Sequence, residues 1–576
     1  MISVIFRAPA MVHPGAMHKK KVVIVGGVAG GASCAARLRR LDERAEIVVL
    51  ERGPYASFAN CGLPYYVGDV IEQESNLLVA TPELFRDRFA IRVLTGHEVT
   101  AVHREAREVE VCASGESFRM GYDALVLAPG AYPVRPPLPG VDREGVFSVR
   151  SIPDSRRIRS WIEDRKVARA VIVGGGFIGL EMAESLVRRG LQVSVVEMLP
   201  QVMPPLDPEM AVPVADELRR HGVELVLGDA LASIREDLTV VTASGHPLPA
   251  DLVVLALGVR PETTLARQAG LELGPRGGIR VDAGMRTSDP NIWAVGDAVE
   301  VTDVVTGEPV CIPLAGPANR QGRLAAESIC GRTRSFRGVQ GTAIVGVFDL
   351  AVAATGASEK TLRRVGAEHA VVYLHPGHHA GYYPGARRIA LKLLFRPSDG
   401  RILGAQAVGE EGVDKRIDVI STAIQLGGTV FDLEESELCY APQFGSAKDP
   451  VNLAGMIAAN VCRGDLRLAR WEDLETNGVP ILDVREPAEF AQGHLQGAFN
   501  VPLGQLRKRL DEVPASVRVC CGVGQRAYYA CRLLLQHGRQ AALLPGGWRT
   551  YQDLLGSGIL PSDGSRESGV GSDQRL

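Results

Sequence analysis

Apolar residues along the chain alternate between short β-branched runs and longer stretches with helical spacing. Residues 21–25 form a β-branched run that ends in a glycine turn, a stretch rich in Ala, Arg and Leu follows, and residues 46–50 form a second apolar run. Strand, turn, helix and strand in this order are typical of one βαβ unit of a parallel sheet. The order recurs over residues 170–196, so the pattern predicts two such units.

The pattern changes twice in the second half of the chain. From about residue 341 to 460, strands are followed by helices, including a predicted helix over residues 413–426. A further α/β pattern starts at residue 471 and ends near residue 555, and residues 561–576 are rich in Gly, Ser, Asp and Arg, which predicts disorder. The fold class is therefore α/β with several domains.

The second unit carries a complete glycine fingerprint. Gly174, Gly176 and Gly179 follow a predicted strand and open a helix in the pattern G-x-G-x-x-G, which makes a tight turn, admits a pyrophosphate and lets helix and strand pack closely. Glu197 ends the next predicted strand, where an acidic residue about 20 residues downstream accepts a hydrogen bond from a ribose 2′-OH. We expect this carboxylate to repel a 2′-phosphate, so NADH is preferred to NADPH.

The first unit carries a weaker version of the fingerprint. Gly26 and Gly31 are present, but Val28 replaces the middle glycine, and Glu51 ends the next strand. By itself this is also compatible with a plain glycine turn in any α/β protein. The presence of a second, complete unit in the same chain favours a dinucleotide-binding role for the first unit as well.

Composition excludes several classes of function. Lys and Arg number 64 against 67 Asp and Glu, and the run of lysines at residues 19–21 only precedes a strand, so no nucleic-acid partner is expected. The chain has no run of 18 apolar residues, so no membrane span is expected. The ten cysteines form no Cys-x-x-Cys pair and no zinc-type spacing, which predicts no metal and a reducing, cytoplasmic location.

Two glycine units, with Ala128-Pro-Gly130-Ala between them and Gly296-Asp297 downstream, resemble the two-dinucleotide-binding-domain flavoprotein disulfide reductases over residues 19 to about 460. The resemblance implies Rossmann-like domains for FAD (residues 19–150 and 266–335) and NADH (151–265), then an α+β dimerisation domain (336–462). Residues 1–18 are an N-terminal extension. The FAD contacts implied by the resemblance are Gly26, Gly27, Ala29, Gly31, Glu51, Arg52, Ala128, Gly130 and Asp297.

Cys61 is the candidate redox thiol. It lies in Ser57-Phe-Ala-Asn-Cys61-Gly-Leu-Pro-Tyr65, among glycine, proline and polar residues. Glutathione-reductase-like enzymes carry two cysteines here and this chain has one, so the thiol is expected to form a sulfenic acid, a mixed disulfide or a persulfide. Its attacking form is the thiolate, which electropositive neighbours would have to favour.

The segment resembles coenzyme A-disulfide reductases and NADH-dependent persulfide/polysulfide reductases. The main alternative, an NADH oxidase or peroxidase, typically carries a histidine inside the first glycine turn, and this chain has none there. The resemblance implies a homodimer in which Tyr440 and Tyr382 of one subunit reach the thiol of the other, although Tyr383 also fits the second position. The implied coenzyme A contacts are Ser33, Arg37, Arg40, Ser57, Asn60, Asn319 and Lys448.

Residues 466–560 resemble a rhodanese domain. Leu482-Asp-Val-Arg-Glu486, Gly493-His494 and Asn500-Val-Pro502 match its order and spacing, and Cys521-Gly-Val-Gly-Gln-Arg526 matches its active loop. Backbone N–H groups of such a loop stabilise a thiolate and a persulfide at Cys521, and we expect Arg526 to add positive charge. Cys520 and Cys531 remain open as assisting thiols.

These features predict an FAD-dependent NADH:persulfide, polysulfide or coenzyme A-disulfide reductase with Cys61 as redox thiol, whose Cys521 carries sulfur. Two alternatives stay open: an NADH oxidase or peroxidase that uses a Cys61 sulfenate, and a sulfurtransferase that delivers sulfur from Cys521 to a protein acceptor. The physiological substrate is left open among persulfide, polysulfide and coenzyme A disulfide.

Overall fold

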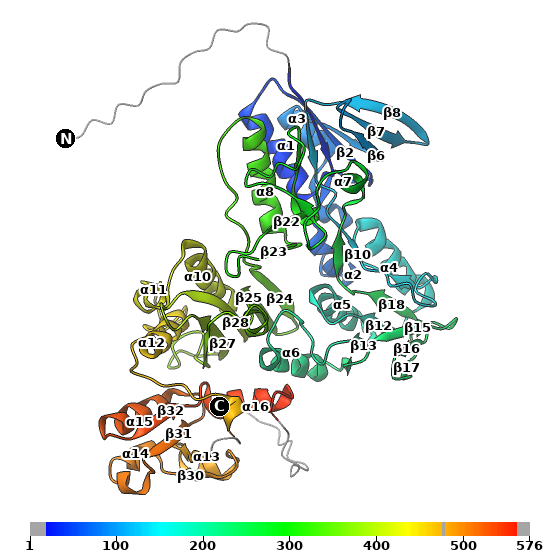
Figure 1. The fold of residues 1–576 in the computed structure, drawn as a ribbon. Coiled ribbons are helices and arrows are strands. Elements are labelled where there is room, and N and C mark those ends of the chain that lie inside the picture. Colours follow the sequence, from blue (N-terminus) through cyan, green and yellow to red (C-terminus); the bar gives the residue numbers. More distant parts are fainter. Residues whose placement is uncertain (1–18, 475–477, 561–576) are drawn as a thin grey trace, which may run out of the picture.

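The computed structural model describes residues 19–474 and 478–560; the predicted extension (1–18) and tail (561–576) lie outside the described residues. Four α/β or α+β domains follow one another along the chain, and the C-terminal one lies against the third at the end of the molecule opposite the first (Figure 1). The predicted fold class is confirmed. The predicted domain boundaries remain predictions.

The first domain is built on a parallel sheet with the order β21-β9-β1-β2-β5. Its strands are β1 (Lys21–Val25), β2 (Glu46–Glu51), β5 (Arg92–Thr95), β9 (Ala124–Leu127) and β21 (Ile292–Ala294). The late strand β21 pairs with β9, so the chain returns to this domain after building the second one. Helices α1 (Ala29–Leu41) and α8 (Ala315–Ile329) lie side by side on one face (Figure 1).

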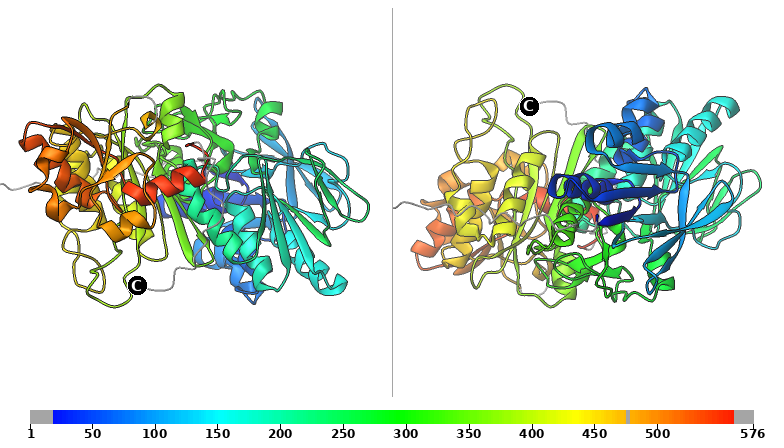
Figure 2. Two further views of the ribbon diagram at one scale, coloured as in Figure 1. Left: turned by 90° about the horizontal axis from the view of Figure 1, so that it is seen from below. Right: turned by 90° about the horizontal axis from the view of Figure 1, so that it is seen from above.

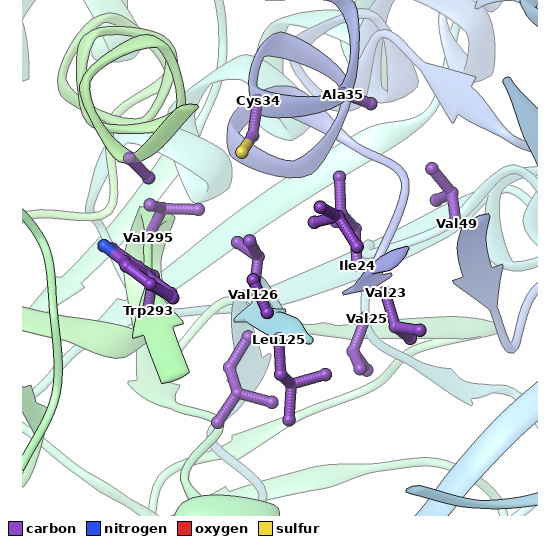
Figure 3. Close-up of a cluster of buried hydrophobic side chains, with 14 of the residues drawn as sticks. Val23, Ile24, Val25, Cys34, Ala35, Val49, Leu125, Val126, Trp293 and Val295 are labelled. Carbon is purple, nitrogen blue, oxygen red and sulfur yellow. The ribbon is translucent and has the colours of Figure 1, made fainter. Parts of the chain in front are cut away.

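The core of this domain is apolar on both sides of the sheet, as expected for buried parallel strands. Side chains of β1, β9 and β21 meet Cys34 and Ala35 of α1, and Trp293 closes one side of the cluster (Figure 3). Cys34 is fully buried, and burial together with the nearby Cys330 raises the pKa of its thiol to about 12, so this cysteine is a packing residue. An antiparallel sheet of β6 (His97–His103), β7 (Glu108–Ala113) and β8 (Glu116–Gly121) extends from the domain.

The second domain repeats the parallel architecture with the order β11-β18-β12-β13-β14. Its sheet strands are β11 (Val146–Phe147), β12 (Arg169–Val173), β13 (Gln192–Glu197), β14 (Glu224–Leu227) and β18 (Leu252–Leu255). Helix α5 (Phe177–Arg188) follows the glycine turn, and α4 (Ile152–Arg165) and α6 (Pro208–Arg220) complete the helical layers.

The third domain is an antiparallel sheet with the order β24-β25-β28-β27-β26, covered by helices on one face. The strands are β24 (Ala343–Val347), β25 (Leu350–Gly356), β26 (Ala370–Leu374), β27 (Ile389–Phe395) and β28 (Ile402–Gly409). Helices α10 (Val413–Leu426), α11 (Val430–Glu435) and α12 (Pro450–Cys462) cover this face, whereas α9 (Glu359–Arg364) packs on Leu394 and Leu403. Helix α10 has the bounds that the sequence predicts.

The C-terminal domain has a parallel sheet with the order β30-β29-β31-β32. Its elements are β29 (Ile481–Asp483), α13 (Pro487–Ala491), β30 (Ala498–Asn500), α14 (Leu503–Leu506), β31 (Ser516–Cys520), α15 (Gln525–Gln536), β32 (Gln540–Leu543) and α16 (Gly547–Gly556). Helix α16, drawn in red, reaches out of this domain and lies against α6 of the second domain (Figure 2). The C-terminal domain is therefore packed directly against the second domain.

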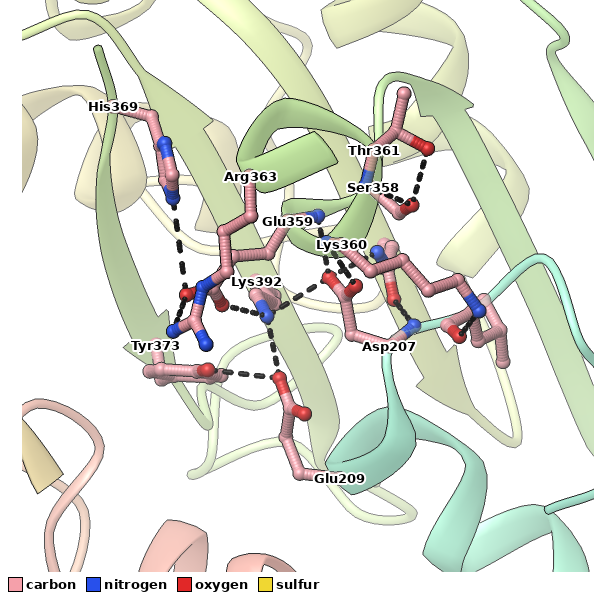
Figure 4. Close-up of polar contacts among 12 residues, drawn as sticks. Asp207, Glu209, Ser358, Glu359, Lys360, Thr361, Arg363, His369, Tyr373 and Lys392 are labelled. Carbon is pink, nitrogen blue, oxygen red and sulfur yellow. Dashed lines mark hydrogen bonds and ion pairs between the residues drawn. The ribbon is translucent and has the colours of Figure 1, made fainter. Parts of the chain in front are cut away.

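A buried charge cluster joins the second and third domains. The ammonium of Lys392, on β27, is fully buried and lies 2.9 Å from Asp207, 2.5 Å from Glu209 and 2.7 Å from Glu359 (Figure 4). Tyr373 also donates to Glu209 at 2.8 Å. Since charges this deeply buried must be paired, the cluster fixes how the two domains meet.

Among the described residues, no helix is long and apolar enough to cross a membrane.

Candidate functional site

The two glycine turns have the same local geometry. Gly26 and Gly174 have φ values of +96° and +114°, and a Cβ on either would lie 2.1 or 2.3 Å from a carbonyl oxygen of the neighbouring strand end. A Cβ on Gly31 or Gly179 would lie 1.9 Å from the carbonyl oxygen of the first glycine in its own turn. Only glycine fits these four positions, which explains why the fingerprint is readable in the sequence.

The acidic residues at the strand ends hold these turns. Glu51 accepts hydrogen bonds from the backbone N–H groups of Gly27 and Gly53, at 2.9 and 2.8 Å. Glu197 accepts from Gly175 at 2.7 Å and from Leu199 at 2.9 Å. Each carboxylate is thereby fixed beside its turn, at the position from which an acidic residue meets a ribose in this type of unit.

Space for a ligand differs between the units at the middle position of the fingerprint. A Cβ on Gly176 would meet nothing within 4 Å, so the second turn is open towards solvent, where a pyrophosphate would approach. In the first unit Val28 takes this position and precedes α1 directly. The next residue, Ala29, has a positive φ of 34° and lines the cavity described below.

A cavity of about 930 Å³ opens at the carboxyl ends of the strands in the first domain. Its wall contains seven of the predicted FAD contacts: Gly26, Ala29, Glu51, Arg52, Ala128, Gly130 and Asp297. Gly27 and Gly31 lie behind this wall, where Gly27 donates to Glu51 and Gly31 packs on Gly26. Glycine-turn backbone together with arginine and carboxylate side chains around this cavity fits an extended dinucleotide such as FAD.

Asp297 lies in a short 3-10 turn, η3 (Gly296–Ala298), at the end of β21. Burial raises the pKa of its carboxyl group, and the nearby Arg150 counteracts that rise. Arg150 lines the same cavity, and burial followed by the charge of Arg52 lowers its pKa. Sequence reasoning missed Arg150, because no motif surrounds it and only the fold brings it beside Gly130 and Asp297.

Cys61 lies between β3 (Ser57–Phe58) and α2 (Leu63–Val67), in the 3-10 turn Asn60–Gly62. It is exposed, and none of the ten cysteines, all of which the structure describes, forms a disulfide. Its neighbour Asn60 lines the cavity. Cys61 is therefore a free thiol that directly follows a residue of the cavity wall, and its redox role remains a prediction.

The electrostatic surroundings of Cys61 differ from the expected electropositive ones. The pKa of its thiol is raised, first by partial burial and then by the carboxylates of Glu181 and Asp297. Glu181 accepts a hydrogen bond from the hydroxyl of Tyr65 at 3.1 Å, and its own pKa is raised by burial. The chain's own charged groups thus favour the neutral thiol, and the sequence gave no signal that α5 of the second domain supplies an acid here.

The residues predicted to contact coenzyme A differ in their burial and in their partners. Ser33 donates to Asn319, so these two lie together on α1 and α8. Arg37 pairs with Glu327 at 2.5 Å, which gives this cation a structural partner that the sequence did not suggest. Ser57 is buried, whereas Arg40, Asn60 and Lys448 are exposed. Their roles in binding remain predictions.

Tyr382 and Tyr440 come together although they lie on different segments of the third domain. Their hydroxyl oxygens are 2.8 Å apart, and the side chains are 75% and 49% exposed. The hydrogen bond to Tyr440 is the main cause that raises the pKa of Tyr382. The neighbouring Tyr383 points elsewhere, with its ring against His379.

The predicted active loop of the C-terminal domain is the segment Cys521–Arg526. Cys521 follows β31 and is buried, and the backbone N–H of Gly524 donates to its Sγ at 3.1 Å. The backbone N–H of Trp548 donates to the carbonyl oxygen of Cys521 at 2.7 Å, so the start of α16 contacts this loop. This arrangement places the sulfur atom of Cys521 where the loop backbone donates one hydrogen bond to it, from Gly524.

The flanking thiols are less suited to react. Cys520 points into the core and burial raises its pKa well above the usual value. Burial, together with the nearby Cys521, raises the pKa of Cys531 to about 12. Arg526, expected to supply positive charge, instead pairs with Glu489 through both terminal nitrogens at 2.6 Å each. Nothing in the local motif identified Glu489 as its partner.

Two glycine-turn units, an exposed thiol beside the cavity and a second, buried thiol directly after β31 are the features of a two-dinucleotide oxidoreductase fused to a rhodanese-type domain. The chain matches the pyridine nucleotide-disulphide oxidoreductase family over residues 20–322, its dimerisation domain over 342–449 and the rhodanese-like domain over 470–554. The chain belongs to the pyridine nucleotide-disulphide oxidoreductase family.

Similar proteins include a coenzyme A disulfide reductase of Staphylococcus haemolyticus, 35% identical over 77% of this chain and 100% of the relative. An NADH oxidase of Methanocaldococcus jannaschii is 38% identical over 75% of this chain and 97% of its own length. The reduced CoADR-RHD of Bacillus anthracis shares 46% identity with a TM-score of 0.92, covering 94% of this chain and 99% of that one. A NAD-dependent persulfide reductase from A. fulgidus shares 39% identity with a TM-score of 0.86, covering 92% and 100%.

Proposed function

We propose that this protein is an FAD-dependent, NADH-oxidising reductase of persulfides, polysulfides or coenzyme A disulfide, with Cys61 as the redox thiol and Cys521 as a sulfur carrier. The observation that carries the proposal is the exposed thiol of Cys61, which has no disulfide partner and directly follows the cavity residue Asn60. The coenzyme A disulfide reductase and the persulfide reductase that resemble the chain over most of its length support it.

The residues of the first unit hold FAD, and those of the second hold NADH. Glu51, Asp297 and the first glycine turn bind the ribose, the ribitol chain and the pyrophosphate of FAD, while Arg52 and Arg150 supply positive charge to the cavity. Bound FAD supplies the two electrons that it takes from NADH. The carboxylate of Glu197, fixed beside the second turn, accepts from the ribose 2′-OH of NADH.

Cys61 performs the sulfur chemistry. Its thiolate attacks one sulfur of the S–S bond in the substrate, a new S–S bond to Cys61 forms, and a thiol or hydrosulfide leaves with a proton. Two electrons then cleave the bond between Cys61 and the attached sulfur, which restores the Cys61 thiolate and releases the attached sulfur as hydrosulfide or as the thiolate of coenzyme A. Because Glu181 and Asp297 favour the neutral thiol, Cys61 must lose its proton before it attacks.

The tyrosine pair supplies a proton in a homodimer. Tyr382 and Tyr440 lie on an exposed face of the third domain, with Phe444 and Leu426 also exposed in that domain, so a partner subunit would cover apolar surface. In the dimer they reach the thiol of the partner subunit and donate to the departing sulfur. Ser33, Arg37, Arg40, Ser57, Asn60, Asn319 and Lys448 form the coenzyme A site.

The test is anaerobic NADH oxidation with coenzyme A persulfide, polysulfide, coenzyme A disulfide and peroxide, compared side by side, with hydrosulfide and free coenzyme A measured as products. Cys61→Ser is expected to abolish turnover and keep FAD bound, whereas the control Cys112→Ser keeps both. Faster turnover of peroxide than of every sulfur substrate would reject the proposal.

The resemblance to an NADH oxidase supports a second candidate, an NADH oxidase or peroxidase that cycles Cys61 through a sulfenic acid. The same substrate comparison separates the two. Sulfur delivery from Cys521 to a protein acceptor is a third candidate, and capture of a stable partner by Cys521→Ser would favour it.

A further inference from the structure

The active loop of the C-terminal domain contains one charged residue, Arg526, and the structure gives it a fixed partner. Both terminal nitrogens of Arg526 donate to the carboxylate of Glu489, each at 2.6 Å, in a bidentate pair. Such pairs are shorter and stronger than single charged hydrogen bonds and fix the orientation of both groups. The pair raises the pKa of Arg526 above its usual value.

Glu489 is held in place independently of Arg526. It is the third residue of a capping box at the start of α13, where it accepts from the backbone N–H of Glu486 at 3.1 Å. The hydrogen bonds from Arg526 are the main cause that lowers the pKa of Glu489 to about 2, and partial burial opposes the shift. Glu489 is therefore ionised at every physiological pH.

The ion pair lies against the sulfur-binding loop. A Cβ on Gly522, the residue after Cys521, would lie 3.4 Å from a terminal nitrogen of Arg526, and the charge of Cys521 is among the influences on the pKa of Arg526. Cys521 itself is 1% exposed, so a sulfur donor has to approach across the exposed and half-buried loop residues. A donor that reaches Cys521 thus meets Arg526 with a carboxylate already bound to it.

We propose that Glu489 is a specificity-determining residue of this loop, which excludes oxyanionic sulfur donors such as thiosulfate and leaves the loop to persulfides. This inference rests on the proposed role of Cys521 as a sulfur carrier. Thiosulfate carries its sulfonate next to the sulfane sulfur and needs a cation at the loop rim, but Glu489 neutralises the cation of the loop and repels the anion. A persulfide has no anionic oxygen next to its transferred sulfur.

The two reactions differ only in the leaving group. With a persulfide, the Cys521 thiolate attacks the outer sulfur, the S–S bond of the donor breaks, and the thiolate that leaves takes the proton of the new persulfide. With thiosulfate, the same attack breaks the S–S bond and releases sulfite. In either case cyanide then takes the outer sulfur as thiocyanate and restores the Cys521 thiolate, so thiocyanate reports both reactions.

The experiment uses the full-length, FAD-loaded protein with Cys61→Ser as the parent, so that only the loop reacts. Glutathione persulfide and thiosulfate are compared as donors to cyanide. Glu489→Gln removes the charge and keeps an oxygen acceptor for the helix cap. In this variant kcat/KM for thiosulfate is expected to rise about tenfold, mainly through a lower KM. A tenfold change corresponds to the free energy of about one charge-assisted hydrogen bond. For the persulfide it is expected to change less than about threefold.

Three further variants make the test specific. Glu489→Asp keeps the charge and is expected to keep thiosulfate activity low. Adding Arg526→Gln to Glu489→Gln is expected to remove the gain, because the freed cation is lost. Glu512→Gln breaks another ion pair of the same domain, with Arg509, and is expected to leave both donors unchanged.

The result that overturns the inference is a thiosulfate-to-persulfide ratio in Glu489→Gln that stays at the parent value, or a gain that persists without Arg526. Failure of the proposed function looks different. In that case the mass of the parent protein shows no sulfur added at Cys521 after incubation with the persulfide.

Discussion

The hydroxyl oxygens of Tyr382 and Tyr440 lie 2.8 Å apart, although 58 residues separate them along the chain. Both side chains are exposed, and each can donate to the other or to a third group. A hydroxyl that accepts from its neighbour becomes a better proton donor, so a hydrogen-bonded pair is suited to protonate a departing sulfur. Several predictions depend on contacts of this kind.

The first prediction concerns the tyrosine pair. Tyr440→Phe is expected to lower kcat about 100-fold, the low end of the range for general acid–base catalysis, and Tyr382→Phe to lower it less because it acts through Tyr440. Tyr383→Phe is the control, since its ring packs on His379. Steady-state NADH oxidation with the sulfur substrate measures the effect.

Hybrid dimers show whether the tyrosines act across the interface. A dimer of one Cys61→Ser subunit and one Tyr440→Phe subunit contains one intact site if each site combines Cys61 of one chain with Tyr440 of the other. We expect about half of the wild-type activity per hybrid dimer. No recovery above the two parent variants would show that both residues act within one chain.

The second prediction concerns the pKa of the Cys61 thiol, which burial and the carboxylates of Glu181 and Asp297 raise. Glu181→Gln removes one of these charges and is expected to lower the pKa of the Cys61 thiol. The rate of alkylation of Cys61 by iodoacetamide as a function of pH measures it. Glu184→Gln on the same helix is the control, and identical pH profiles for Glu181→Gln and wild type would contradict the prediction.

The third prediction concerns the choice of nicotinamide nucleotide. Glu197→Gln removes the negative charge beside the second glycine turn, so the ratio of kcat/KM for NADPH to that for NADH is expected to rise about tenfold. The matched control is Glu51→Gln, the same position in the first unit, which is expected to weaken FAD retention and leave the ratio unchanged. An unchanged ratio in Glu197→Gln would remove this carboxylate from nucleotide selection.

The fourth prediction concerns the buried cluster of Figure 4. Burial opposes the charges of Lys392 and Asp207, but their mutual attraction wins: the pKa of Lys392 lies well above its usual value and that of Asp207 below. Lys392→Met removes the cation shared by Asp207, Glu209 and Glu359, of which Glu359 keeps its pair with Arg363. The change is expected to lower the free energy of unfolding by about 3–5 kcal/mol at neutral pH. Lys415→Met, at a half-exposed lysine, is the control, with an expected loss below about 1 kcal/mol.

The free energy of unfolding is also expected to depend on pH through these buried charges. Because the pKa of Asp207 is lower in the folded chain than in the unfolded chain, ionised Asp207 stabilises the fold above the unfolded-chain pKa of about 4. This stabilisation is lost as the pH falls through the pKa that Asp207 has in the folded chain. A raised pKa at Lys392 contributes stability below about pH 10, which is lost at higher pH. Wild type is thus expected to weaken in acid. Lys392→Met is expected to become more stable as the pH falls from 7 to 5, because the carboxylates that have lost Lys392 take up protons. Denaturant unfolding at pH 7 and pH 5 measures the free energy of unfolding of both proteins.

Local features of the chain were predictable because they depend on short stretches of backbone. Gly26, Gly31, Gly174 and Gly179 are required where a Cβ would strike a carbonyl oxygen, so the fingerprint and the fold around it follow from the sequence. The predicted helix over residues 413–426 has its predicted bounds since glycine residues flank it at both ends. The cavity wall also follows, because the carboxyl ends of parallel strands meet at one edge.

Motifs did not reveal the electrostatic partners of the site residues. Arg37 and Arg526 were both expected to present free positive charge, yet each is bound to a glutamate. Cys61 was expected among electropositive groups, and the nearest charged groups that act on it are carboxylates. A motif gives the type of a residue and its neighbours in sequence, whereas its charge environment depends on other segments.

The sequence by itself determined the two dinucleotide units, the lone thiol at position 61, the sulfur loop at position 521 and the family, because each is encoded within a few consecutive residues. Only the tertiary structure decided that Tyr382 meets Tyr440, that Arg150 enters the cavity, that Glu489 occupies Arg526 and that Lys392 ties two domains together. The physical reason is distance along the chain. The ion-paired and hydrogen-bonded partners lie 37 to 185 residues apart, and packing of the whole core sets which of them come into contact.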